Sequence, residues 1–173
     1  MIIGIVGYMG SGKSTVGPLL AKQLHYEFID FDHYIETQEK TTITEIFEAK
    51  GEIYFRKIEA AYLVQLLEEV TKDTVIAFGG GTPCYGDNMK TIKDAGVTTV
   101  YLNVHFKELT RRLWESREGR PLIAAQPSSK ALKDYVRKHL FERGFYYNLS
   151  DHAILTKEAS PEEIVENIKA KLF

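Results

Sequence analysis

Residues 7–14 read GYMGSGKS, and they follow the apolar run IIGIV at residues 2–6. The stretch matches the phosphate-loop pattern GxxxxGK[ST], and a helical pattern continues from Val16 to Leu24. Glycines allow successive N–H groups to turn toward one anion, and the N-terminus of the following helix adds a favourable dipole. A strand, a glycine-rich loop and a helix in this order predict a binding site for a nucleoside triphosphate.

The phosphate loop also assigns roles to individual residues. Lys13 is expected to reach the β- and γ-phosphates, and the Ser14 hydroxyl is placed to bind Mg²⁺. The alternative is a glycine-rich turn that only caps a helix, which the complete motif disfavours. The residues expected to bind the nucleotide are Gly10, Ser11, Gly12, Lys13, Ser14 and Thr15.

Length, charge and composition limit the class of protein. A chain of 173 residues with 44% apolar and 27% charged residues is ordinary for one globular domain. The net charge of -2 gives no reason to expect nucleic acid or an anionic membrane as a partner. No apolar run approaches the roughly 20 residues that span a bilayer. Cys84 is the only cysteine, which excludes an internal disulfide and favours a reducing cytoplasm, and we expect a cytoplasmic monomer.

Apolar runs of strand type alternate with helical patterns along the chain. Thr42 with Glu45, and Ser160 with Glu163, form capping-box signatures, while Gly96 suits a helix C-terminus. Strands are expected at 2–6, 27–30, 74–78, 98–102 and 153–156. Helices are expected at 13–24, 32–38, 43–50, 52–72, 87–95, 106–116, 130–149 and from 161, with a loop at 117–129.

Five short apolar strands separated by helices predict an α/β fold. Its parallel sheet would be covered by helices on both faces, in three layers. Ligands of such sheets bind beyond the carboxyl ends of the strands. The phosphate loop, Asp30 with Asp32, and the turn Gly79–Gly81 all follow predicted strands, so we expect them to meet in one crevice.

Two aspartates follow the second predicted strand. Phosphoryl transfer needs a carboxylate near Mg²⁺ and often a second one at the acceptor hydroxyl, and Asp30 and Asp32 are suited to divide these tasks. The alternative is a strand end capped by solvated carboxylates. The consecutive glycines of Gly79–Gly81 favour a steep turn or close approach to a ligand over a loose loop.

Three arginines lie in segments that suit anion binding. Arg56 has Glu52 and Glu59 on its side of a helix and suits a carboxylate, although taken alone a surface salt bridge is the commoner role. Arg120, in the stretch from Arg117 to Leu122, is the candidate cation of a lid, the alternative being a solvated loop. Arg143 lies late in a helix, and the aromatic residues around it, Phe141, Phe145, Tyr146 and Tyr147, are expected to be core residues.

Taken together, these segments resemble shikimate kinase over nearly the whole chain. The residues that carry the resemblance extend well beyond the phosphate loop, which many kinases and GTPases share. They are GYMGSGKST at 7–15, DFDHYIE at 30–36, Ile46-Phe47, Gly51-Glu52, Phe55-Arg56, Glu59, Gly79–Gly81, Arg120-Pro121-Leu122, Arg143 and Tyr146.

The resemblance implies a fold, a reaction and a set of site residues. It implies a P-loop NTPase fold like that of nucleoside monophosphate kinases, with strand order 2-3-1-4-5, as one kinase domain over 1–173. A substrate-binding helical segment would cover about 32–60 and a lid about 112–129. The implied reaction transfers the γ-phosphate of ATP, with Mg²⁺, to the 3-hydroxyl of shikimate on the pathway to chorismate.

The roles implied by the resemblance are assigned residue by residue. Lys13, Asp32 and Arg120 are catalytic, with Asp32 at the acceptor hydroxyl. Ser14 and Asp30 belong to the metal site, Arg120 covers ATP as the lid cation, and Arg112 stacks on adenine. Arg56 and Arg143 clamp the substrate carboxylate, and Glu59 orients Arg56 or a ring hydroxyl. The remaining substrate contacts are Gly79, Gly80, Gly81, Phe47, Phe55 and Pro121.

Other functions remain open from the residues alone. A kinase of another hydroxylated carboxylate, such as gluconate, also suits Asp32 and an arginine clamp, although the two phenylalanines and Arg143 favour a cyclic acceptor. A nucleoside monophosphate kinase fits a carboxylate site less well. A nucleotide-dependent switch or a non-catalytic binding protein is a different class, but the base-reading Asn-Lys-x-Asp signature of GTPases does not occur.

Overall fold

Five parallel strands form a single sheet in the order β2-β3-β1-β4-β5, which confirms the predicted α/β fold and its strand order. The computed structural model describes the backbone of residues 1–173 and every side chain except that of Pro121. The strands are β1 (Ile2–Val6), β2 (Glu27–Asp30), β3 (Thr74–Ala77), β4 (Thr98–Asn103) and β5 (His152–Leu155). The helices are α1 (Lys13–Leu24), α2 (Phe31–Glu39), α3 (Ile43–Glu69), α4 (Asn88–Asp94), α5 (Phe106–Glu115), α6 (Pro121–Ala124), α7 (Ser129–Tyr147) and α8 (Pro161–Leu172), with a short 3-10 turn at Thr82–Cys84.

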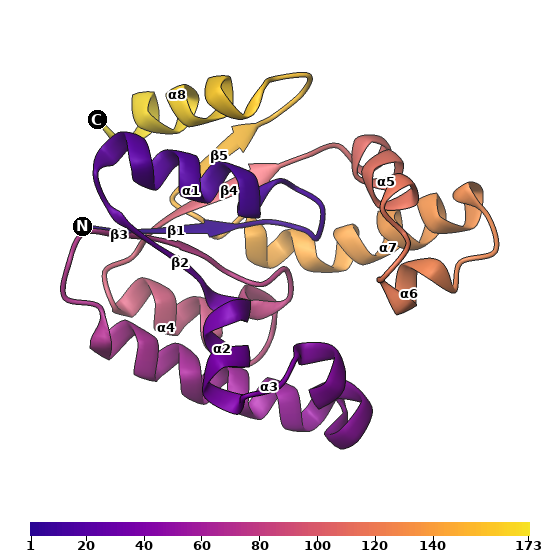
Figure 1. The fold of residues 1–173 in the computed structure, drawn as a ribbon. Coiled ribbons are helices and arrows are strands. Elements are labelled where there is room, and N and C mark those ends of the chain that lie inside the picture. The colour runs from indigo at the N-terminus through magenta and orange to yellow at the C-terminus, as the bar shows by residue number, and fades with distance from the viewer.

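Helices cover both faces of the sheet and give three layers. Figure 1 shows α1 and α8 together on one face, and α3 and α4 on the other. Side chains alternate across a strand, so Ile3 and Ile5 of β1 pack in the core beneath α1 and α8, whereas Val6 belongs to the core on the opposite face. The core beneath α1 and α8 consists of buried aliphatic side chains, and the opposite core also contains buried aromatic ones, as expected for a parallel sheet covered on both faces.

Several local predictions are confirmed. Capping boxes begin α3 at Thr42 and α8 at Ser160. The two helices expected at 43–50 and 52–72 together form α3. Gly51 interrupts α3 with a non-helical backbone of φ 82° and ψ 174°. The second part ends at Glu69 instead of residue 72, because the backbone of Val70 is already extended.

The segment 117–129, predicted to be a loop, contains the short helix α6, so that prediction was wrong in part. The backbone N–H groups of Ile123 and Ala124 both donate to the carbonyl of Arg120, at 3.0 and 2.8 Å. Proline suits the first turn of a helix because that turn needs no N–H donor. Ile123 is 1% exposed and packs in the core, which supplies the apolar contact that holds this turn.

The aromatic residues near Arg143 were expected in the core, and the structure corrects this for two of them. Tyr147 is fully buried, but Phe141 and Phe145 are 87% and 68% exposed. They lie one helical turn apart on the outer side of α7, whereas Tyr147 points inward. Within the described residues, no helix is both long and apolar enough to cross a membrane.

Candidate active site

The phosphate loop connects β1 to α1 at the carboxyl edge of the sheet. Gly12 precedes the helix with φ 97°, a left-handed conformation that a residue with a Cβ rarely adopts. This geometry turns the loop into the first turn of α1, whose free N–H groups make an anion site. Ser14 and Thr15 are exposed on that first turn, and Ser11 is buried beneath the loop.

Lys13 lies folded over the loop. Its Nζ donates to the carbonyl oxygens of Gly7 and Tyr8 at 2.7 and 3.0 Å. Burial lowers the pKa of Lys13 to about 8, and the nearby carboxylates Asp32 and Asp30 oppose this shift. Phosphate oxygens at this position would restore the preference for the charged form, because an opposite charge nearby favours ionisation.

The two aspartates take different positions at the start of α2. Asp30 caps the helix, because its Oδ1 accepts a hydrogen bond from the N–H of His33 at 3.1 Å. Asp32 lies in the first turn and faces the glycine turn: a Cβ built on Gly79 would lie 2.5 Å from Asp32 Oδ1. Burial raises the pKa of Asp32 to about 6, with further contributions from Asp30 and Glu59, while Lys13 opposes the rise.

A cavity of about 350 Å³ brings together most residues predicted to contact substrate. Phe47 and Phe55 form one wall, with ring centroids 4.7 Å apart. The predicted residues that line the cavity are Asp32, Phe47, Phe55, Arg56, Glu59, Gly79, Gly80, Gly81 and Arg143. The side chain of Pro121, which was predicted to contact substrate, lies outside the described part of the structure.

Arg56 and Arg143 enter this cavity from two different helices. Arg56 Nη1 donates to Glu59 Oε1 at 2.9 Å, and its Nε lies 3.5 Å from Glu52 Oε1, so both expected glutamate neighbours are present. Arg143, from α7, lies over the phosphate loop with its guanidinium carbon 5.9 Å from the centroid of the Tyr8 ring. Two guanidinium groups in one cavity with aromatic walls suit a cyclic acid.

The sequence reasoning missed part of the cavity lining. Tyr135 and His139 line it together with Arg143, at a spacing of four residues along α7. Such spacing places the three side chains on one face of a helix, and this was a signal that the sequence offered. The other residues that it missed are Met9, Ile43, Tyr85 and Leu122, and Glu52 was assigned only to Arg56.

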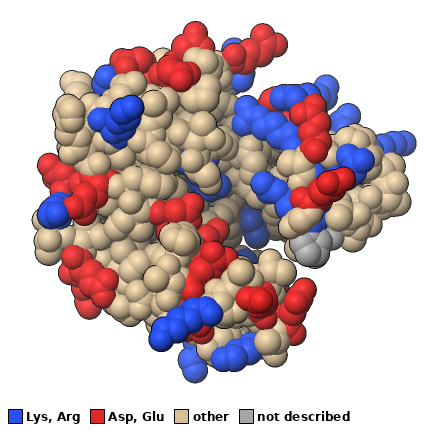
Figure 2. Space-filling view, viewed as in Figure 1, with Lys and Arg blue, Asp and Glu red and all other residues tan. Residues whose placement is uncertain are grey.

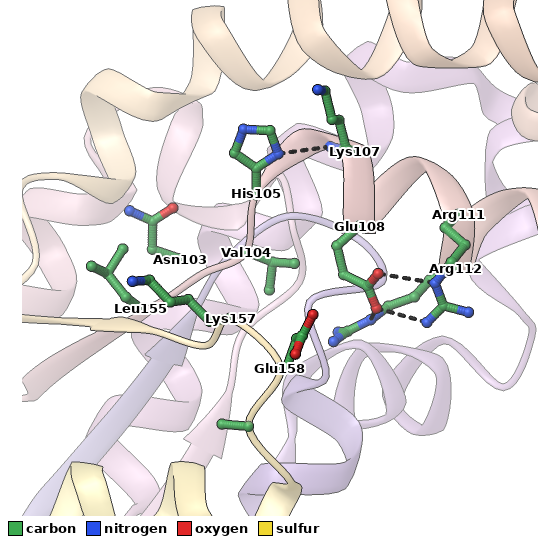
Figure 3. A pocket seen from close by; sticks show the side chains of 11 residues that line it. Asn103, Val104, His105, Lys107, Glu108, Arg111, Arg112, Leu155, Lys157 and Glu158 are labelled. Carbon is green, nitrogen blue, oxygen red and sulfur yellow. Dashed lines mark hydrogen bonds and ion pairs between the residues drawn. The ribbon is translucent and has the colours of Figure 1, made fainter.

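A second cavity of about 930 Å³ lies on the other side of the phosphate loop. Arg112 borders it, with Nη1 donating to the carbonyl of Gly10 at 3.1 Å and Nε donating to Glu108 at 2.9 Å. Figure 3 shows Glu158, from the segment after β5, pointing toward the pair formed by Glu108 and Arg112. Only Arg112 of this lining was predicted, and the segment from Leu155 to Ala159 was missed because it contains no recognisable motif.

The predicted lid cation, Arg120, lines neither of the two cavities. The side chain of Arg120 is exposed. Its charge is still close enough to Lys13 to help lower the pKa of that lysine. Figure 2 shows Lys and Arg side chains gathered over the lobe of α5–α7, which faces a hollow beside the rest of the molecule. The structure therefore places a basic lobe beside the phosphate loop.

The fold and the site together define a class of protein. A five-stranded parallel sheet of order 2-3-1-4-5 with a phosphate loop after its central strand is a P-loop NTPase fold. The cavity beside the loop is lined by two arginines and three carboxylates, and the two guanidinium groups suit a small acid.

Comparisons with known proteins then give the family. A family model described as shikimate kinase matches residues 9–173. A shikimate kinase of Flavobacterium johnsoniae is 39% identical over 166 residues, covering 96% of this chain and 95% of that one. The chain belongs to the shikimate kinase family.

Solved structures agree with this assignment. The crystal structure of shikimate kinase from Bacteroides thetaiotaomicron has a TM-score of 0.85 and 32% identity, and covers 99% of this chain and 98% of that one. Shikimate kinase from Acinetobacter baumannii in complex with shikimate has a TM-score of 0.84 and 30% identity, covering 99% and 92% of the two chains.

Proposed function

We propose that this protein transfers the γ-phosphoryl group of ATP to the 3-hydroxyl of shikimate and forms shikimate 3-phosphate. The observation that carries the proposal is the convergence of Asp32, Arg56 and Arg143 in one cavity beside the phosphate loop, in a chain of this family. Gluconate as the acceptor is not favoured, because the family match and the paired phenylalanine wall both indicate a cyclic acid.

The acceptor is held at its carboxylate end and at its reacting hydroxyl. The guanidinium groups of Arg56 and Arg143 bind the carboxylate with charge-assisted hydrogen bonds. The ring packs against Phe47 and Phe55, and the reacting hydroxyl faces Asp32. Fixing both ends of a small rigid molecule makes attack on the γ-phosphate effectively intramolecular, which removes much of the entropic cost of the reaction.

Transfer then depends on charge placed around the γ-phosphate. The acceptor oxygen forms a bond to phosphorus as the bond to the ADP oxygen breaks, and the hydroxyl proton passes to Asp32. Lys13 and Arg120 stabilise the charge on the phosphoryl oxygens, and the N–H groups of the phosphate loop hold the rest of the triphosphate. We assign Arg112, which borders the cavity of about 930 Å³, to contact with the adenine.

Mg²⁺ fits the oxygen donors beside the loop. Ser14 presents an exposed hydroxyl on the first turn of α1, and the Asp30 carboxylate lies close enough to Lys13 to influence its pKa. Hydroxyl and carboxylate oxygens are the hard ligands that Mg²⁺ prefers, usually with phosphate oxygens and water completing the set. When bound, the ion neutralises phosphate charge.

We also propose that the protein works as a cytoplasmic monomer.

ADP release measured side by side with shikimate, gluconate and no acceptor tests the proposal. We expect ADP release that depends on shikimate, with stoichiometric formation of a phosphorylated product. Release only with gluconate would keep the kinase fold but overturn the substrate. Slow ADP release that is indifferent to every acceptor would instead support a nucleotide switch.

A further inference from the structure

The carboxylate of Glu59 is buried, and both of its oxygens accept hydrogen bonds from other side chains. Its side chain is 1% exposed. Oε1 accepts from Arg56 Nη1 at 2.9 Å, and Oε2 accepts from the hydroxyl of Thr82 at 2.8 Å. Because each oxygen already has a donor within the protein, the carboxylate is fixed in the orientation that faces Arg56. This geometry favours an orienting role for Glu59 over direct contact with a ring hydroxyl.

Thr82 is itself held in place. It is fully buried, and its backbone N–H donates to the carbonyl of Gly79 at 3.0 Å. Its own carbonyl accepts from Nδ2 of the buried Asn88 at 2.9 Å. The backbone that carries the hydroxyl is therefore held in the 3-10 turn that follows the glycines.

The same turn confines Arg56 from a second side. The guanidinium carbon of Arg56 lies 3.8 Å from the centroid of the Tyr85 ring, and the Tyr85 hydroxyl donates to Glu52 Oε1 at 3.0 Å. Gly81 leaves space for this stacking, since a Cβ there would lie 2.7 Å from Arg56 Nη2. The ring, the two glutamates and the glycine backbone together leave the guanidinium little freedom.

We propose that Thr82 and Tyr85 are positioning residues, which fix the guanidinium of Arg56 in the orientation that receives the substrate carboxylate. The inference rests on the proposed function, because it takes Arg56 as part of the carboxylate clamp. Both residues act through Arg56 and its partners Glu59 and Glu52. A guanidinium that is ordered before binding loses less conformational entropy when the substrate binds. We therefore expect loss of either positioning residue to lower the affinity for the acceptor.

Thr82→Val tests the hydroxyl, because valine keeps the shape and removes the donor to Glu59. We expect the KM for shikimate to rise about ten-fold, as expected for loss of a hydrogen bond to a charged group, with kcat and the KM for ATP within about three-fold. Thr82→Ser should restore the KM. The control is Thr74→Val, since Thr74 is also buried but donates to Lys72 at the far end of β3.

Tyr85 is tested by separating its ring from its hydroxyl. Tyr85→Phe keeps the stacked ring and should raise the KM for shikimate only about two-fold. Tyr85→Leu removes the aromatic face and should raise it about five-fold, in the range of a cation–π contact. Equal KM values for the two variants and the wild type would remove Tyr85 from the proposal.

A measurement without substrate separates this proposal from the proposed function. The rotation of the Arg56 guanidinium, followed by ¹⁵N NMR on protein with labelled arginine, should be restricted in the wild type and in Thr74→Val, and faster in Thr82→Val. If the wild type does not turn over shikimate, the proposed function fails while the NMR result still decides the positioning role. Wild-type KM and wild-type guanidinium rotation in Thr82→Val would overturn the proposal.

Discussion

The cavity around Arg56 and the cavity around Arg112 hold their arginines in different ways. The Arg56 side chain is 18% exposed and its partner Glu59 only 1%. The side chains of Arg112 and its partner Glu108 are 30% and 32% exposed. Partly exposed ion pairs of the second kind contribute little and are screened by salt, whereas a more deeply buried pair joined by a hydrogen bond is held more firmly.

This difference suggests how the two ligands are received. The acceptor side is ordered in advance, which suits a small rigid acid that must be recognised by direction as well as by charge. The nucleotide side has the half-buried Arg112 and the exposed Arg120, the proposed lid cation, and we expect these side chains to rearrange around the triphosphate.

The largest effect is expected at Lys13, because it serves the phosphates from which the phosphoryl group is transferred. Lys13→Ala should lower kcat at least about 100-fold through the loss of charge stabilisation in the transition state. Steady-state ADP release measures this. Lys22→Ala, an exposed lysine in the last turn of the same helix, is the control and should behave like the wild type. A kcat within about three-fold of the wild type in Lys13→Ala would break the assignment.

Arg56→Ala should act on the acceptor side alone. We expect the KM for shikimate to rise about 50-fold or more, since a charge-assisted pair in a buried site is lost, while the KM for ATP stays within about two-fold. Initial rates with each substrate varied in turn give both constants. Arg137→Ala, at an exposed position on α7, is the matched control. An equal rise in both KM values would mean that Arg56 is no specific clamp.

The pH profile should report the two shifted groups. Asp32 must be ionised to accept the proton, and its pKa of about 6 means that kcat/KM for shikimate falls as the pH drops below about 6. Lys13 must be charged to receive the triphosphate, and its pKa of about 8 in the nucleotide-free protein means that kcat/KM for ATP falls as the pH rises above about 8. The fall in kcat/KM below about pH 6, the lower limb of the profile, should be absent from the residual activity of Asp32→Asn. A lower limb that persists in this variant would assign that titration to another group.

The smallest effect is expected at Arg112, on the exposed side. Arg112→Ala should raise the KM for ATP about five-fold, the range of one stacked cation, and should leave the KM for shikimate unchanged. Rates at varied ATP concentration measure this. A larger rise in the KM for shikimate than in the KM for ATP would contradict the assignment of Arg112 to the nucleotide side.

The sequence predicted the parts of the site that depend on local patterns. The phosphate loop, the capping boxes and the break at Gly51 follow from short-range spacing, and the family resemblance supplied the strand order and the residues of the acceptor cavity. Thr82 and Tyr85 were missed because their roles depend on contacts across 23 and 33 residues of chain, which no spacing rule describes. The short helix α6 was missed because the burial of Ile123 is a tertiary effect.

Calorimetric titration of shikimate into the nucleotide-free protein tests most directly whether the acceptor site is formed before ATP binds. We predict saturable binding to the wild type, with affinity at least about ten-fold weaker in Arg56→Ala. Binding that appears only when a non-hydrolysable ATP analogue is present, or equal affinity in the two proteins, would contradict the account.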